Sequence, residues 1–104
     1  MTDLNKGEIG QPLRVNLGAD ISAATSATIL AQPEVGTEKE FIATIPAVPV
    51  TVDGVTLNAN EYAEYTTLTK DDLDYEGRWR MRLKADFSST SIRKTNFVKF
   101  RVLA

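Results

Sequence analysis

The chain has 104 residues, of which 12 are Lys or Arg and 14 are Asp or Glu, and it contains no His and no Cys. This length accommodates a single hydrophobic core. The missing residue types exclude disulfides, thiolate nucleophiles, thiolate metal sites and His-based acid–base catalysis. The N-terminal sequence MTDLNKGEIG has no signal-peptide pattern, and no apolar run approaches 18 residues, so we expect neither secretion nor membrane insertion.

The first half of the chain consists of short alternating apolar and polar runs separated by turn residues. This pattern is typical of all-β proteins. We expect strands over residues 12–17, 25–32 and 38–45, the last of which places Phe41 in the core.

The middle of the chain contains strong turn signals. Pro46 and Pro49 predict an edge strand or a crossover between sheets, because proline interrupts a hydrogen-bonded ladder. Asp53 and Gly54 predict a two-residue hairpin turn, since this pair readily adopts the positive φ angles of a type I′ turn. Residues 61–69 are rich in β-forming types and predict a further strand.

The second half contains the clearest strand patterns. Residues 78–85 alternate strictly between two faces. The apolar face consists of Trp79, Met81, Leu83 and Ala85, and the other face of Arg78, Arg80, Arg82 and Lys84. A last strand over residues 96–103 directs Val98, Phe100 and Val102 inward and Lys99 and Arg101 outward. We expect residues 87–96 to form a polar loop between these two strands.

The order of these signals predicts an immunoglobulin-like β-sandwich of about seven strands over residues 9–104, preceded by an N-terminal arm over residues 1–8. The arm is either a disordered terminus or a segment laid on a neighbouring molecule. Leu73 and Tyr75 occupy the corner before the penultimate strand, where such folds often contain a hydrogen-bonded Tyr. The predicted core residues are Trp79, Met81, Leu83, Phe41, Val98, Phe100, Leu73 and Tyr75.

Four short motifs resemble one known family. They are GQPLRVNL at residues 10–17, DISAAT at residues 20–25, Gln32–Pro33, and LDYEGRW at residues 73–79. In these motifs the chain resembles the immunoglobulin-like domains of tailed-phage virion proteins, typified by the N-terminal domain of baseplate upper proteins. The resemblance implies a bacteriophage virion structural protein without cofactor, made in the host cytoplasm and located in the virion.

The chain departs from that family in two respects. Ala23 stands where the family usually has Gly, and no receptor-binding or trimerising extension follows residue 104. The second departure favours a small stand-alone virion part over a baseplate or receptor-binding role.

In the acidic run at residues 71–76, Asp72, Asp74 and Glu76 alternate and Gly77 follows, as in a calcium-binding loop. A twelve-residue calcium loop closes with a bidentate Glu, and the corresponding position here is Leu83. The run is better interpreted as a solvated turn with an N-capping acid. Scattered carboxylates offer no catalytic cleft and no Gly-rich phosphate loop is present, so we expect no catalytic, metal or cofactor residues.

The net charge of −2 hides an uneven distribution along the chain. Residues 78–104 carry eight cations and one acid, a net +7, whereas residues 1–77 carry four cations and thirteen acids, a net −9. The predicted partner interface is the outward set Arg78, Arg80, Arg82, Lys84, Lys99 and Arg101.

Two interpretations of this set stay open. It forms a ladder of cross-strand ion pairs with Glu38 and Glu40 on an adjacent strand, or it forms a surplus positive face that meets an acidic partner surface. That partner is another virion protein or the acidic part of a second copy, as in a head-to-tail ring. Nucleic acid is disfavoured by the pI near 5.1 and by a lack of exposed aromatic residues between the cations.

The sequence therefore predicts a non-enzymatic virion subunit that attaches in multiple copies to the capsid, neck or tail through protein–protein contacts. The alternative is a host-surface or glycan-binding adaptor of the tail or baseplate.

Overall fold

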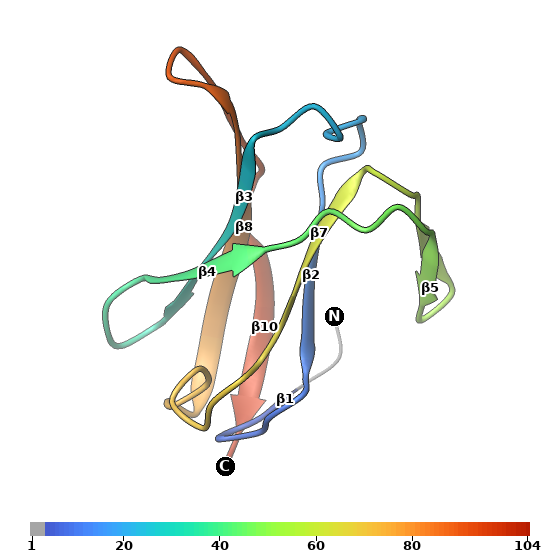
Figure 1. Ribbon diagram of the computed structural model, residues 1–104. Coiled ribbons are helices and arrows are strands. Elements are labelled where there is room, and N and C mark those ends of the chain that lie inside the picture. Colours follow the sequence, from blue (N-terminus) through green and yellow to red (C-terminus); the bar gives the residue numbers. More distant parts are fainter. Residues whose placement is uncertain (1–3) are drawn as a thin grey trace.

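The computed structural model describes residues 4–104, and in this range the chain is all-β (Figure 1). The strands are β1 (Leu4–Asn5), β2 (Pro12–Asn16), β3 (Ser26–Pro33), β4 (Lys39–Ala43), β5 (Val50–Val52), β6 (Val55–Leu57), β7 (Tyr62–Thr66), β8 (Gly77–Ser88), β9 (Ser91–Lys94) and β10 (Val98–Leu103). Each sequence-predicted strand has a counterpart, and β1 and β9 are additional.

Two curled sheets enclose the core. The larger sheet has the order β1-β10-β8-β3-β4, with β9 also paired to β8, and β2 pairs with β7 in a smaller sheet. In Figure 1, β2 and β7 lie nearer the viewer than the fainter β8 and β10. An isolated bridge joins the sheets where β4 ends, because Thr44 and Glu64 exchange two backbone hydrogen bonds of 2.9 Å.

The core lies between the two sheets and is centred on β8. Trp79 is 2% exposed and Met81 and Leu83 are fully buried, and they pack in one cluster with Leu13 and Val15 of β2. Of the predicted core residues, six are buried: Phe41, Leu73, Trp79, Met81, Leu83 and Phe100. The strict alternation over residues 78–85 therefore assigned the two faces of this strand correctly.

The core prediction is wrong at Val98, which is 39% exposed. Val98 lies opposite Met81, so its side chain is on the inner face as expected. It remains accessible because β10 is near the border of the sheet, and the two-residue β1 pairs only with the far end of β10, at Val102 and Leu103. Strand alternation identifies the face of a residue but not whether another layer covers it.

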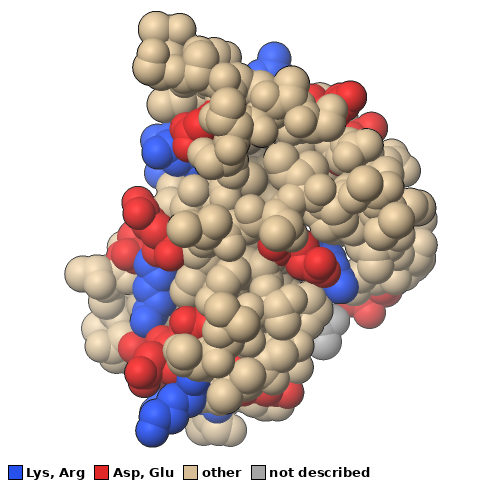
Figure 2. Space-filling view, in the orientation of Figure 1, with Lys and Arg blue, Asp and Glu red and all other residues tan. Residues whose placement is uncertain are grey.

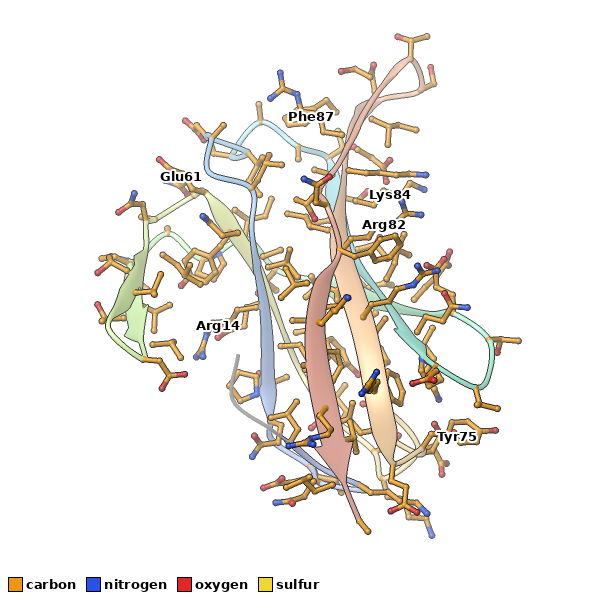
Figure 3. All side chains as sticks on the ribbon, turned by 180° about the vertical axis from the view of Figure 1, so that it is seen from behind. Arg14, Glu61, Tyr75, Arg82, Lys84 and Phe87 are labelled. Atoms are coloured by element: carbon orange, nitrogen blue, oxygen red, sulfur yellow. The ribbon has the colours of Figure 1, made fainter. Side chains whose placement is uncertain are left out.

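The core prediction is also wrong at Tyr75, which is 48% exposed. Figure 3 shows its side chain projecting outward near the start of β8. Its backbone carbonyl accepts a 2.9 Å hydrogen bond from Nε1 of Trp79. A different tyrosine, the partly buried Tyr65 of β7, donates its hydroxyl to Oδ2 of Asp72 at 2.8 Å.

Two predicted irregular segments contain strand. The expected loop at residues 87–96 includes the end of β8 and all of β9, which pair as a hairpin. Every residue of β9 is exposed, so the segment lacks the apolar alternation that would reveal it.

In the expected N-terminal arm, Leu4 is buried and β1 pairs in parallel with β10, so from residue 4 onward the arm belongs to the domain. Residues 1–3 lie outside the described residues.

The predicted hairpin turn is confirmed. Asp53 has φ of 51° and Gly54 has φ of 79°, and they join β5 to β6. Both angles are positive, as a type I′ turn requires.

Candidate functional site

The six predicted interface residues lie on one surface of the larger sheet, facing away from the core. Arg78, Arg80, Arg82 and Lys84 of β8 and Lys99 and Arg101 of β10 form this cationic face. Figure 3 shows Arg82 and Lys84 pointing away from β8 on the side opposite Arg14 of β2. The structure thus brings the whole predicted set together, because β8 and β10 pair in antiparallel register and their outward positions coincide.

The register places like charges directly opposite one another. The like-charged pairs are Arg80 with Lys99, Arg78 with Arg101, and Lys84 with Lys94 of β9. Like charges directly opposite on one face of a sheet are destabilising. The fold therefore concentrates positive charge on this face at a cost to its own stability.

The ion-pair ladder with Glu38 and Glu40 does not form. The strand beside β8 is β3, not the strand at residues 39–43, so Arg82 lies opposite Leu30. Glu40 lies opposite Leu30 from the other side, two strand spacings, or about 10 Å, from β8. Within residues 4–104, no ion pair joins either Glu to Arg78, Arg80 or Arg82.

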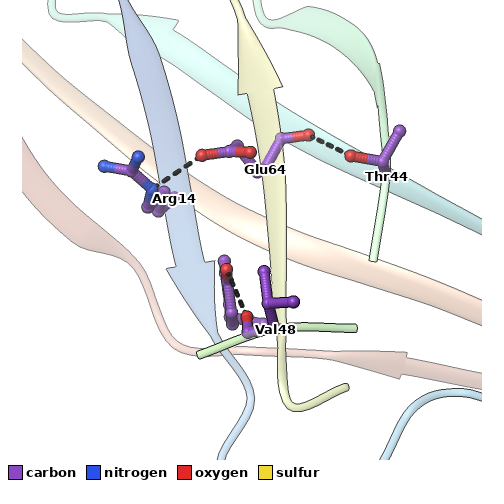
Figure 4. A network of polar contacts seen from close by, with 5 residues as sticks. Arg14, Thr44, Val48 and Glu64 are labelled. Atoms are coloured by element: carbon purple, nitrogen blue, oxygen red, sulfur yellow. Dashed lines mark hydrogen bonds and ion pairs between the residues drawn. The ribbon is translucent and has the colours of Figure 1, made fainter. Parts of the chain in front are cut away.

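Two cations outside the cationic face form close ion pairs. Nε of Arg14 lies 2.7 Å from Oε1 of Glu64, whose backbone carbonyl accepts a hydrogen bond from the hydroxyl of Thr44 (Figure 4). Lys39 lies 3.2 Å from Asp74. On the cationic face, Lys84 reaches Asp86 only at 4.0 Å.

The charge split along the chain does not become two separate halves in space. Figure 2 shows, along the left edge of that view, Lys and Arg side chains lying between Asp and Glu side chains. Glu40 of β4 lies alongside β3 and therefore borders the same sheet surface as the cationic face.

Phe97 also belongs to this surface and is not among the predicted interface residues. Its ring centroid lies 4.1 Å from Cζ of Arg80 and 4.7 Å from Cζ of Arg82, and the residue is 37% exposed. These distances are those of cation–π contacts. The signal was present, because extending the outward alternation of Lys99 and Arg101 by two residues reaches Phe97.

Arg82 is more buried than Arg78 and Arg80. Its side chain is half-buried, and its Nε is closed to solvent without a hydrogen-bond partner among the described residues. Leu30 points to the same surface yet is only 4% exposed. Because long side chains bury their aliphatic stems along apolar surface, Arg82 and Glu40 on either side account for that burial.

A groove of about 650 Å³ runs along the cationic face. Its lining residues are Gln32, Pro33, Glu34, Arg78, Trp79, Arg80, Lys99, Phe100 and Arg101. Four of the six predicted interface residues line it, whereas Arg82 and Lys84 lie beyond it along β8. A guanidinium nitrogen of Arg80 donates to Oε1 of Gln32 at 3.0 Å, which orients this side chain along the groove.

The acidic run forms a hydrogen-bonded turn. Asp72 accepts hydrogen bonds from the backbone N–H groups of Leu68 and Thr69 and from the hydroxyls of Thr69 and Tyr65. Burial raises the pKa of Asp72, but these hydrogen bonds outweigh it and leave the pKa below its ordinary value. Burial and the neighbouring Asp72 carboxylate raise the pKa of Tyr65 to about 12. Throughout the described range, no three carboxylates gather in an arrangement that would hold a metal ion.

No protein family, curated protein or solved structure matches this chain. In the part that the structure describes, no helix is long and apolar enough to cross a membrane.

Proposed function

We propose that this chain is a non-enzymatic binding protein, a small accessory subunit of a bacteriophage virion that attaches in multiple copies to the capsid, neck or tail. Binding occurs through the cationic face, which docks on a carboxylate-rich surface of another virion protein. No cofactor takes part.

The like-charge register of β8 against β10 is the observation that carries this proposal. The like-charged contacts on this surface oppose folding, and within residues 4–104 no ion pair joins a Glu or Asp to Arg78 or Arg80. Complementary charge on a partner relieves this repulsion upon binding. Guanidinium groups suit such an interface because they bind carboxylates with two parallel hydrogen bonds.

The fold that we propose for this subunit is an immunoglobulin-like sandwich. It is supported by the two curled sheets around one core and by the buried Trp79 at the start of the central β8. The virion assignment is supported by the four motifs at residues 10–17, 20–25, 32–33 and 73–79.

The exposed Phe97 favours a second candidate, single-stranded nucleic acid, since bases stack on aromatic side chains flanked by cations. It removes one of the two arguments against nucleic acid. The other remains, because the chain is acidic overall with a pI near 5.1. The proposal therefore keeps a carboxylate-rich protein as the partner.

Particle incorporation tests the proposal. Virions of the phage that encodes the chain should contain it, and the variant Arg80→Glu/Lys99→Glu should be absent from them or strongly depleted. The control Lys70→Glu/Arg93→Glu makes the same change in net charge at exposed positions outside the cationic face. Virions that lack the wild-type chain, or that incorporate the first variant as well as the control, would contradict the proposed function.

A further inference from the structure

We infer that the partner segment bound by the cationic face is an extended polypeptide with an acidic side chain at every second residue, lying along β8. This inference rests on the proposed function and specifies the chemistry of its partner.

The spacing of the cations carries the argument. Alternate side chains of a strand repeat every 6.6–6.8 Å or so, and this is the spacing of Arg78, Arg80, Arg82 and Lys84 along β8. An extended partner segment has the same repeat, so its alternate residues stay in register with all four cations. A helix repeats every turn at about 5.4 Å and would be out of register by about 4 Å over the same set.

The groove supplies a second row of cations for the same segment. Lys99 lies directly beside Arg80 on the neighbouring β10 and both line the groove, so a carboxylate bound near them faces two positive charges. The groove volume of about 650 Å³ is within the range of ligand clefts, about 300–1,000 Å³. Glu34 lines one end of the groove beside Arg78, so an acid is accepted less well there than at Arg80 and Arg82.

Phe97 prepares two of the guanidinium groups for binding. It contacts both Arg80 and Arg82, and Gln32 orients Arg80 from the opposite side. Holding long side chains in place before binding lowers the entropy lost on binding. The unpartnered Nε–H of Arg82 is a donor that a reoriented guanidinium can offer to a carboxylate.

Two synthetic peptides of identical composition test the inference. One alternates Thr and Glu along its length, and the other carries its Glu residues as a single block. Both are capped at their ends so that they have equal charge. Titration calorimetry measures their affinities for the full chain at low salt.

The alternating peptide should bind about tenfold more tightly than the blocked peptide, because only it pairs each acid with a cation. Arg80→Gln/Lys99→Gln should abolish that preference, and the control Lys70→Gln/Arg93→Gln should retain it. Phe97→Leu should weaken the alternating peptide severalfold without changing the number of charges. Circular dichroism confirms that each variant is folded.

Each outcome separates the inference from the proposed function. Equal affinity for the two peptides, with loss of both in Arg80→Gln/Lys99→Gln, overturns the periodic partner but leaves an acidic partner intact. Binding of neither peptide contradicts both. Tighter binding of an oligothymidylate with the same number of negative charges identifies nucleic acid as the ligand and overturns the inference.

Discussion

Replacing Lys99 by Glu should make the protein more stable while weakening partner binding. Lys99 and Arg80 are directly opposite on β10 and β8, and both are exposed. The change Lys99→Glu turns this like-charged pair into an oppositely charged pair without altering the buried core. A gain in stability from the removal of a binding residue is the outcome expected when charge is kept for function at a cost to folding.

The size of the effect follows from simple electrostatics. For charged ends about 6 Å apart, the repulsion in water is about 0.7 kcal/mol, so reversing one sign changes the energy by about 1.4 kcal/mol. Physiological salt, with a screening length of about 8 Å, reduces this to about 0.6 kcal/mol. The free energy of unfolding should rise by that amount, and Tm should rise by about 2–5 °C.

Urea denaturation and thermal unfolding at low and high salt measure this change. The control is Lys70→Glu, which makes the same charge reversal at an exposed position outside the cationic face. The stabilisation by Lys99→Glu should exceed that of the control and should shrink as salt rises. Destabilisation by Lys99→Glu, or an effect equal to the control at every salt concentration, would refute the like-charge reasoning. Loss of partner binding alongside the gain in stability completes the expected result.

Further predictions concern the core, the acidic turn and the hairpin. Trp79→Ala should cost about 3–5 kcal/mol of unfolding free energy in urea denaturation, a large part of the stability of a small domain, because it empties a core position. The phenol of Tyr65 should ionise with a pKa of about 12 in an ultraviolet titration. Since this pKa is raised from 10.0, its contribution to stability should be complete below pH 10 and be lost between pH 10 and 12. The pKa of Asp72 is lowered from 3.8, so its contribution should be present above that pH and be lost as the pH falls below it; Asp72→Asn should remove this loss from the acid-unfolding curve. Gly54→Val should destabilise the hairpin, because Gly54 has φ of 79°, and NMR shifts should change around β5 and β6 while the core shifts stay constant.

The sequence by itself determined the features that depend on neighbouring residues in the chain. Strict alternation assigned Trp79 to the core and Arg80 to the surface, because successive side chains of a strand point to opposite faces. Asp53 and Gly54 predicted the hairpin turn because both residue types readily adopt positive φ angles. The concentration of cations after residue 78 was visible as well, since it is a property of composition.

Only the tertiary structure decided which strands became neighbours and which faces were covered. Alternation with a period of two is the same whichever strand lies alongside, so it could not show that β3, rather than the strand bearing Glu40, pairs with β8. The exposure of Val98 was hidden for the same reason, and so were the contacts of Phe97 with two arginines, although alternation assigns Phe97 to the outward face. Pairing between strands far apart in sequence depends on closure of the whole sheet around its core. That closure gathered the cations of β8 and β10 on one surface of the larger sheet.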